Sequence, residues 1–523
     1  MKRFKVGAGL LALLLAVLLS FSACGNGSPA APPPGPPAPI VTEVVVVGGG
    51  LAGLAAAVSA AQGDVDVILV ERMGITGGES RRSGGSISAA GSIIQGRQDI
   101  TCDAADPTAW RAHFEMRSAQ SYPRNSLFPT AAALDFLMLE AARFIEWMDD
   151  MGFQFGPLTG FARDPQPRLH SGAGAAFQGP AGLLNFFDAQ ARDAGVDIRI
   201  NAKAVEILNE NGPGSRVTGV RLENGTIIYA YAVIMATGGF AADLQRFMPW
   251  VDFPYHHTTL NVADGQGIQM TVDAGAELWA DPWIKGIGPT PVSLIRNANE
   301  NANIAIGGAG GPMVNADGDV LFLGDATTLA MYVRDDTGAR FVLENHHYSI
   351  TAGAVLQVNR EGHNAFAIFD SALASPTTAQ LATAGVYTGE DPAELAYNAG
   401  IDEAGLLAAV AQWNEIVAGT TADPLDYEGF GILGEPIETG PFFAVRLMPT
   451  AMGTFGGVRT NVTTGEVLAY GTNNPIPGLF AAGETASRPF YDKVYMAGVG
   501  LGQAGTTGRA AGTAAAAFVA AQD

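Results

Sequence analysis

A short apolar strand that runs into a glycine-rich turn and then into an alanine-rich helix constrains the fold of this chain most. The strand and turn occupy residues 44–53, and the helix is expected over residues 54–62. Gly48, Gly50 and Gly53 have the G-x-G-x-x-G spacing. Glycines at this spacing let the backbone turn tightly and approach a pyrophosphate, whose charge then lies at the helix N-terminus. The segment therefore predicts the start of a dinucleotide-binding unit.

A second apolar strand, expected over residues 65–70, ends at Glu71. A carboxylate at this distance from the glycines can accept hydrogen bonds from a ribose. The glycine spacing alone is a weak signal in a chain with 67 glycines. Strand, turn, helix, strand and acid together favour dinucleotide binding, and the alternative is a glycine-rich turn in an ordinary βαβ unit.

Later segments favour FAD over NAD. Residues 77–85 form an amide-rich and hydroxyl-rich loop with two arginines, suited to phosphates and to the edge of a flavin. Residues 234–239 and 478–484 are further strands that end in small residues. A helix is expected to start between Tyr495 and Gly512, with its first amides toward an anionic flavin ring. A nicotinamide enzyme has no need of a cofactor motif so close to its C-terminus, so FAD is the predicted cofactor.

The residues predicted to contact FAD are small residues of these turns and polar or charged residues beside them. They are Gly48, Gly50, Leu51, Ala52, Gly53, Glu71, Arg72, Gly78, Glu79, Ser80, Ser83, Gly84, Gly85, Ala204, Ala236, Thr237, Gly238, Asp264, Gly483, Glu484, Gly500 and Leu501. No metal site is predicted, because the chain has only two cysteines and no cysteine cluster for zinc, haem or iron–sulfur binding.

Composition excludes several classes of protein. The 523 residues are 48% hydrophobic and only 15% charged, which is typical of a folded α/β protein with a sizeable core. A formal net charge of -22 repels the phosphates of nucleic acids. We therefore expect a small-molecule substrate and no nucleic-acid partner.

The N-terminal segment predicts export and lipid anchoring. Three basic residues precede an apolar run over residues 6–19, as in a secretory signal peptide. Residues 20–25 resemble a bacterial lipobox around Cys24, although Phe21 stands where leucine is usual, and simple secretion is the alternative. The proline-rich residues 29–39 would form a stiff spacer. We expect an extracytoplasmic lipoprotein held at the cell membrane by Cys24.

Six groups of motifs together resemble the FAD-dependent fumarate reductase and succinate dehydrogenase flavoprotein family, which includes urocanate reductases and 3-ketosteroid dehydrogenases. They lie at residues 44–53, 77–85, 236–239, 264–267, 338–344 and 478–512. The resemblance implies an α/β fold in which a Rossmann-like, discontinuous FAD-binding domain carries an inserted α+β cap. The expected divisions are a signal peptide (1–23), a lipid-anchor and linker segment (24–40), the FAD-binding domain (41–277 and 441–523) and the cap or substrate domain (278–440).

The resemblance also implies where electrons come from. Neither a haem-binding segment nor an FMN-carrying domain is expected ahead of the FAD-binding domain. The predicted electron partner is therefore a separate electron-transfer protein, or a membrane quinone or cytochrome.

Four positions that handle carboxylates in fumarate reductases are changed in this chain. The resemblance aligns them with Asp281, Tyr348, Gly453 and Tyr495, which makes a C4-dicarboxylate substrate improbable. It matches instead the 3-ketosteroid dehydrogenases, and so implies that Tyr348 is the acid/base and that Tyr495, with the Gly498 amide, polarises a carbonyl. The alternative is that both tyrosines only pack at a domain interface.

Two further observations leave the substrate open. Residues 147–161 offer phenylalanines but lack the third tyrosine of the ketosteroid enzymes. Arg446, Arg459 and Arg488 could hold a monocarboxylate, contact the flavin or serve the structure.

The resulting prediction is an FAD-dependent oxidoreductase acting on CH–CH bonds. It would reduce a C=C bond conjugated to a carbonyl, with hydride from flavin N5 and a proton from Tyr348. The alternatives are a desaturase that passes electrons to quinone or cytochrome, a reductase of the fumarate or urocanate type, and a flavin lipoprotein that only relays electrons.

Overall fold

The computed structural model describes residues 37–101, 103–119, 127–161, 164–291, 313–314, 320–322, 330–344, 348–373, 381–382, 384–426, 431 and 434–522. The chain divides into Met1–Ala38 and Pro39–Asp523, and the second unit carries all the elements below. The predicted signal peptide and Cys24 lie outside the described residues. Within the described part of the chain, no helix combines the length and hydropathy needed to cross a membrane.

A six-stranded sheet forms the centre of the first half of the fold. Its order is β20-β21-β11-β2-β3-β7, parallel except for the antiparallel edge strand β20. The strands are β2 (Val44–Val47), β3 (Val67–Val70), β7 (Asp197–Arg199), β11 (Ala232–Met235), β20 (Glu466–Leu468) and β21 (Pro475–Ala481). The central strands consist of Val, Ile, Leu, Ala and Met and are buried throughout, as expected for parallel strands covered on both faces.

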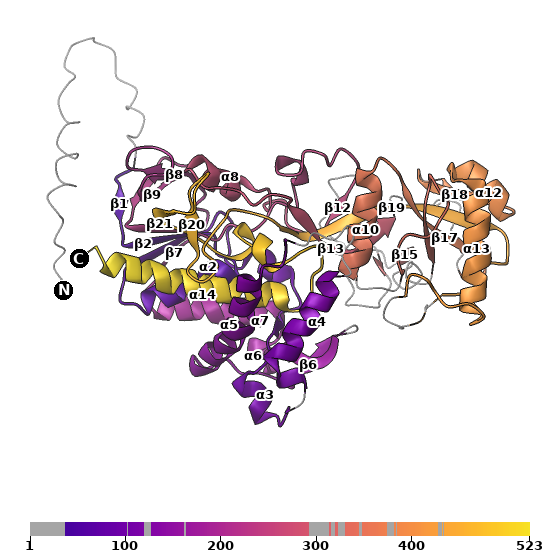
Figure 1. Cartoon of the computed structure of the whole chain (residues 1–523). Helices are drawn as coiled ribbons and strands as arrows, with labels where there is room; N and C mark the ends of the chain where they lie inside the picture. Colours follow the sequence, from indigo (N-terminus) through magenta and orange to yellow (C-terminus); the bar gives the residue numbers. More distant parts are fainter. Residues whose placement is uncertain are drawn as a thin grey trace, which may run out of the picture. The chain divides into compact units, whose positions relative to one another are not determined.

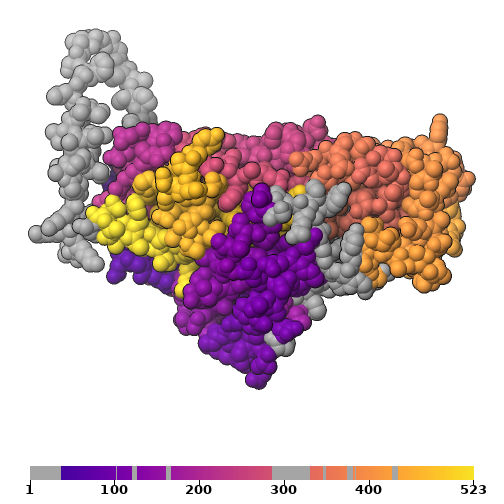
Figure 2. Space-filling model, in the orientation of Figure 1, coloured from indigo at the N-terminus to yellow at the C-terminus, as the bar shows by residue number. Residues whose placement is uncertain are grey.

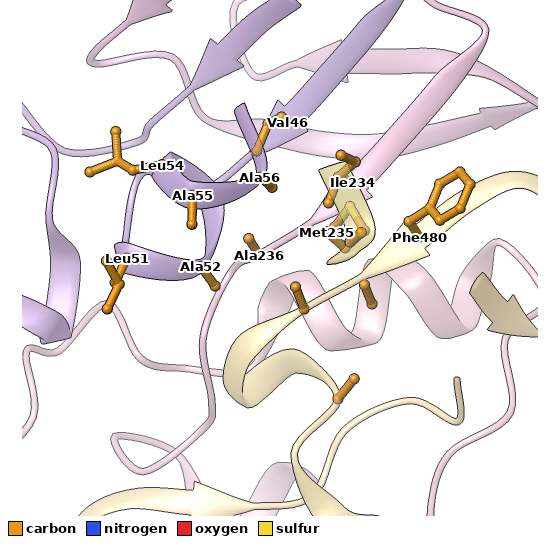
Figure 3. Packing of buried hydrophobic residues seen from close by; sticks show 14 of the residues in the cluster. Val46, Leu51, Ala52, Leu54, Ala55, Ala56, Ile234, Met235, Ala236 and Phe480 are labelled. Atoms are coloured by element: carbon orange, nitrogen blue, oxygen red, sulfur yellow. The ribbon is translucent and has the colours of Figure 1, made fainter. Parts of the chain in front are cut away.

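Two helices from opposite ends of the chain pack together against this sheet. They are α2 (Leu51–Ala61) and α14 (Val499–Ala520), and Figure 2 shows the yellow C-terminal residues beside the indigo N-terminal ones. A Cβ at Gly508 or Gly512 would overlap the backbone of α2. These two glycines therefore allow the two helix backbones to approach closely. Figure 3 shows the small side chains of α2 beside Ile234 and Met235 of the sheet.

The remaining elements of this half include a small mixed sheet and a helical layer (Figure 1). The sheet is β1 (Ile40–Val41), β10 (Ile227–Tyr229), β9 (Val217–Leu222) and β8 (Ala204–Asn209). The layer contains α3 (Ile93–Arg97), α4 (Pro107–Ala119), α5 (Ala131–Asp150), α6 (Gly174–Phe177) and α7 (Gly179–Asp193), with the sheet β4 (Ile87–Ser88), β6 (Asp164–His170), β5 (Thr159–Phe161). Helix α8 (Gln266–Asp273) lies apart from this layer, beside β8. Short 3-10 helices are η1 (Gly78–Arg82), η2 (Asp103–Ala105), η3 (Leu244–Arg246), η5 (Gly483–Thr485) and η6 (Arg488–Phe490).

A second mixed sheet has the order β12-β19-β17-β16, and β13 and β18 also pair with β19. Its strands are β12 (His256–His257), β13 (Trp283–Pro291), β16 (Met331–Arg334), β17 (Ala365–Asp370), β18 (Val386–Gly389) and β19 (Phe442–Phe455). A separate pair is β14 (Met313–Val314) with β15 (Val320–Phe322). The helices of this half are α10 (Tyr348–Arg360), α12 (Pro392–Ala399) and α13 (Glu403–Val417).

The strand β17 shows why this sheet is covered on both faces. Its alternate residues belong to two separate hydrophobic clusters, with Phe369 in the cluster that includes Val355 of α10 and Phe366 in the cluster that includes Trp413 of α13. This period of two is the pattern of a sheet between two helical layers.

The predicted α/β fold is confirmed, and the elements around the glycine turn lie close to their predicted positions. The helix predicted from residue 54 begins at Leu51, because Gly50 is its N-cap. The sheet that contains β19 includes strands from both the predicted FAD-binding segments and the predicted cap. The division into 41–277, 278–440 and 441–523 therefore stays a prediction.

Candidate active site

A cavity of about 460 Å³ lies at the carboxyl ends of the parallel strands. Val47, Val70 and Ala236 line it at the ends of β2, β3 and β11, and Ala482 lines it just after β21. Ligands in open α/β sheets bind at this edge, where the loops that follow the strands meet. The cavity has the size of a typical small-molecule or cofactor site.

The glycine-rich turn shapes one end of the cavity. Gly48 has φ +104°, and a Cβ there would overlap the Ala236 carbonyl. A Cβ at Gly53 would overlap the carbonyl of Gly48, so this glycine closes the turn from behind. The N-cap Gly50 provides no side-chain hydrogen bond to the first amides of α2, and it lines the cavity. The Leu51 N–H, the first amide of α2, donates to the Ser80 hydroxyl at 3.2 Å. A glycine-rich helix N-terminus with a hydroxyl beside it is suited to a pyrophosphate.

Glu71 lies beside this turn at the end of β3. Its carboxylate accepts hydrogen bonds from the Gly49 N–H at 2.7 Å and from the Met73 N–H at 2.8 Å. The two amides fix the carboxylate while leaving lone pairs for ribose hydroxyls. Arg72 and Asp264, which also line the cavity, form an ion pair at 3.3 Å.

The N-terminus of α14 lines the other end of the cavity. Gly498 is the N-cap with φ +75°, and Gly500, Leu501 and Ala504 of the first turns face the cavity. The positive end of the helix dipole therefore points toward the space in which an anionic ring would be stabilised. The glycine-rich turn fits the pyrophosphate of FAD, Glu71 fits its ribose and the N-terminus of α14 fits its flavin, and all three line one cavity.

The predicted FAD contacts gather around this cavity. All of them line it except Gly53, Gly84 and Gly85. Gly53 closes the turn, and a Cβ at Gly85 would overlap the backbone of Gly179, so both act through packing. No structural reason for the prediction of Gly84 is found, since a Cβ there would meet nothing within 4 Å.

Tyr495 also lines the cavity, beside the N-terminus of α14. Burial raises the pKa of its phenol, while the Lys285 ammonium and hydrogen bonds with the Gly498 and Gly500 amides oppose this rise. Gly498 itself is not among the lining residues and meets the cavity through this tyrosine. The predicted pair of Tyr495 and Gly498 is thus close together, whereas its action on a substrate stays a prediction.

The side chain of Tyr348 lies outside the described residues, but its place in the chain is described. Helix α10 begins at Tyr348. The next residue, Ser349, accepts a hydrogen bond from the Tyr495 N–H at 3.1 Å. The helix that carries Tyr348 therefore starts beside Tyr495, although the two are far apart in sequence.

A polar cluster that the sequence did not reveal occupies the same end of the cavity. Lys285 of β13 is only 7% exposed, and its ammonium forms an ion pair with Glu484. Its Nζ lies 5.5 Å from the centroid of the Tyr495 ring. The second oxygen of Glu484 accepts a hydrogen bond from the Thr454 N–H of β19 at 3.3 Å. The signal in the sequence that could have revealed this cluster is the lysine in the apolar strand that begins at Trp283.

Glu79 on η1 lines the cavity near this cluster. Burial raises its pKa to about 7, and the Glu484 carboxylate adds to the rise. The Leu260 N–H, which donates to Glu79 at 2.5 Å, and the cations Arg82 and Lys285 act in the opposite direction. Glu79 therefore changes charge near neutral pH.

The arginines considered as carboxylate ligands lie elsewhere. Arg446, Arg459 and Arg488 are not among the described residues that line the cavity. Arg488 is fully buried and donates to the carbonyl oxygens of Asp281, Tyr491 and Asp492. Arg459 forms an ion pair with Glu277. Both of these side chains serve the structure.

Residues 43–501 match the family model described as FAD binding domain. The chain belongs to this family. FAD is therefore its cofactor, and the chain is an FAD-dependent oxidoreductase of the predicted flavoprotein group.

Relatives and solved structures agree with this assignment. The chain is 26% identical over 447 residues to a probable fumarate reductase of Shewanella frigidimarina, covering 83% of this chain and 68% of that protein. It is 25% identical over 512 residues to the vinyl phenol reductase of Lactiplantibacillus plantarum, covering 90% and 95%. The fold resembles 3-ketosteroid delta1-dehydrogenase from Sterolibacterium denitrificans with a TM-score of 0.69, at 18% identity and 91% and 99% coverage.

Proposed function

We propose that this FAD-dependent enzyme reduces a C=C bond conjugated to a carbonyl or an equivalent polar group in a small, uncharged substrate. The observation that carries the proposal is the phenol of Tyr495, which lies in the cavity beside the N-terminus of α14. A phenol is a neutral hydrogen-bond donor, so it suits a carbonyl oxygen better than a carboxylate.

The charges of the cavity support an uncharged substrate. The ammonium of Lys285 lies 5.5 Å from the Tyr495 ring centroid, and Glu484 compensates its charge. Farther along the cavity, Arg72 pairs with Asp264 and Lys203 pairs with Glu223. Arg82 is exposed and donates to the Thr258 carbonyl at 2.9 Å. Carboxylate recognition typically uses a bidentate arginine, and Arg72, one of the arginines that line the cavity, already has a carboxylate partner.

In this scheme the bound FAD supplies the hydride. The hydroxyl of Tyr495 binds the substrate oxygen and stabilises the negative charge that develops on it. The α-carbon takes its proton from Tyr348. Tyr348 is the first residue of α10, and the next residue, Ser349, accepts a hydrogen bond from the Tyr495 N–H. The reverse reaction, a desaturation, would use the same two tyrosines, and the likeness to the ketosteroid dehydrogenase fold favours it as the second candidate.

We also place the enzyme outside the cytoplasm, anchored through Cys24. No NADH is supplied there, so electrons would come from a separate electron-transfer protein or from a membrane quinone or cytochrome. This source of electrons favours the reductive direction.

Reoxidation of the reduced flavin tests the function. The FAD-bound protein is reduced with dithionite without oxygen, and fumarate, urocanate, a cinnamate, a vinyl phenol and a cyclic enone are added one at a time. We expect rapid return of the oxidised flavin absorbance with the uncharged vinyl phenol or enone and slow return with fumarate. Reoxidation by fumarate alone would refute the uncharged substrate, and reoxidation by none of the five would favour electron relay.

The matched variant is Tyr495→Phe, which removes one hydroxyl and keeps the ring. It should slow reoxidation by the preferred acceptor by about 10²-fold, the usual loss for one hydrogen-bond donor to a developing oxyanion. An unchanged rate would remove Tyr495 from the scheme.

A further inference from the structure

Lys285 is a buried cation to which the proposed reaction gives no role. It lies in β13 after Trp283 and Ile284, both of which are almost completely buried. Burying an ion pair generally costs more in desolvation than the attraction returns. The Lys285–Glu484 pair is therefore poorly explained by stability alone, and its position at the cavity points to function.

Lys285 lies close to Tyr495, the tyrosine proposed to bind the carbonyl. Its Nζ lies 5.5 Å from the Tyr495 ring centroid. A Cβ on Gly500, in the first turn of α14, would lie 3.3 Å from the same nitrogen and 3.7 Å from the Tyr495 hydroxyl. The ammonium and the phenol thus flank the same glycine at the helix N-terminus.

We propose that Lys285 is a positioning residue that holds the Tyr495 side chain in place and strengthens its hydroxyl as a donor to the substrate oxygen, with Glu484 fixing the ammonium. The inference rests on the proposed function, because it gives Tyr495 its partner. A cation near an aromatic ring is attracted to the negative face of the ring. Its positive charge also favours a negative charge on the phenol oxygen.

The surroundings of Tyr495 support this assignment. Lys285 is the largest of the influences that lower its pKa, and the Gly498 and Gly500 amides act in the same direction. Burial and the Glu484 carboxylate raise it. From α10, the uncharged Ser349 forms hydrogen bonds with the Tyr495 backbone. Among these influences, Lys285 supplies the full positive charge.

Glu484 has the geometry of a clamp for the ammonium. One of its oxygens pairs with Lys285 and the other accepts the Thr454 N–H. Lys285 pairs in register with Gly453 of the neighbouring strand, and a Cβ at Gly453 would lie against the Glu484 carboxylate. The absence of a side chain at Gly453 therefore leaves the room that Glu484 occupies.

The test separates a functional lysine from one that only neutralises Glu484. Lys285→Met alone leaves the partly buried Glu484 carboxylate without its cation and can impair folding. The decisive protein is therefore the double variant Lys285→Met/Glu484→Gln, which removes both charges. Lys285→Arg is the matched control that keeps the positive charge. Bound FAD, measured by its visible absorbance, shows that each protein is folded and loaded.

The readout is the titration of Tyr495 itself in FAD-bound protein labelled with 3-fluorotyrosine, followed by fluorine NMR. The resonance of this residue is assigned by its loss in Tyr495→Phe. We expect the double variant to raise the pKa of Tyr495, because Lys285 lowers this pKa more than Glu484 raises it, and to lower kcat about tenfold with little change in KM. Lys285→Arg should restore most of both.

An unchanged titration and an unchanged kcat in the FAD-loaded double variant would overturn the role of Lys285. Failure of the proposed function looks different. Tyr495→Phe would then turn over at the normal rate, whatever the titration of Tyr495 shows.

Discussion

At the scale of single residues, the sequence predicted which positions gather but not how their charges are balanced. Tyr495 and Gly498 were found because a family motif marks both, and the structure brings them together at the start of α14. Lys285 was missed because its partner Glu484 lies 199 residues away, and no local pattern distinguishes a paired buried lysine from one that extends to solvent.

The acid/base role of Tyr348 is tested by Tyr348→Phe. This change removes the proton donor and nothing else, so turnover should fall by at least about 10²-fold while FAD stays bound. The measurement is steady-state reduction of the acceptor found in the reoxidation screen. Tyr397→Phe is the control, because that side chain is 85% exposed on α12 and its variant should behave as wild type. Equal rates for the two variants would eliminate Tyr348 as the acid.

The raised pKa of Glu79 predicts that the stability of the protein depends on pH near neutrality. Its pKa is raised by burial from 4.5 to about 7 in the folded state. Between these values the folded protein holds a proton that the unfolded chain has lost, so the free energy of unfolding decreases as the pH rises through this window. The decrease attributable to Glu79 is about 2 kcal/mol after allowance for its partial exposure.

Glu79→Gln should remove this decrease. The amide oxygen can still accept the Leu260 N–H, and the side chain no longer ionises. Urea unfolding at pH 5 and pH 8 should show the variant equal to wild type at pH 5 and more stable at pH 8. Glu146→Gln, an exposed change on α5, serves as control. A variant that is less stable at pH 8 would contradict the assignment.

At the scale of elements, periodicity and glycine spacing predicted the strands and helices of the cofactor-binding half. Of the glycines in α14, Gly500 is the one predicted to contact FAD, and it lines the cavity. Gly508 and Gly512 instead face the backbone of α2. Both uses leave the same signature in the sequence, because each requires the absence of a Cβ, so the sequence alone could not separate them.

Gly512→Val tests this helix contact. The new side chain would overlap the Ala56 carbonyl and force α14 away from α2. We expect a loss of about 3 kcal/mol in the free energy of unfolding and weaker FAD binding, since both helices contribute N-termini to the cavity. Thermal melting and flavin content measure the two effects. Ala517→Val, at an exposed position of the same helix, should leave both unchanged.

At the scale of the whole molecule, the fold class and the cofactor followed from the order of the motifs along the chain. The limits of the cap stay a prediction, because β19 pairs with β12 and β13 as well as with β17 and β18. Sequence motifs mark turns and ligand contacts, whereas long-range pairing of this kind leaves no local pattern.

Anchoring is tested by Cys24→Ser. If this thiol carries the lipid, the wild-type protein should be recovered with the membrane fraction of its host, and the variant should be released after cell disruption in buffer. Fractionation followed by flavin fluorescence measures the distribution. Cys102→Ser is the control, since the only other cysteine should have no effect on it. Membrane recovery of both variants would exclude lipidation at Cys24.

The length of β19 has a consequence for how the protein unfolds on heating. Its early residues Phe442–Val445 pair with β18, and near its end Thr454 donates its N–H to Glu484 at the cavity. Melting of the distant sheet would therefore remove a wall of the flavin site in the same event. Release of the yellow chromophore and loss of circular dichroism should share one midpoint temperature, with no colourless, half-folded intermediate between them.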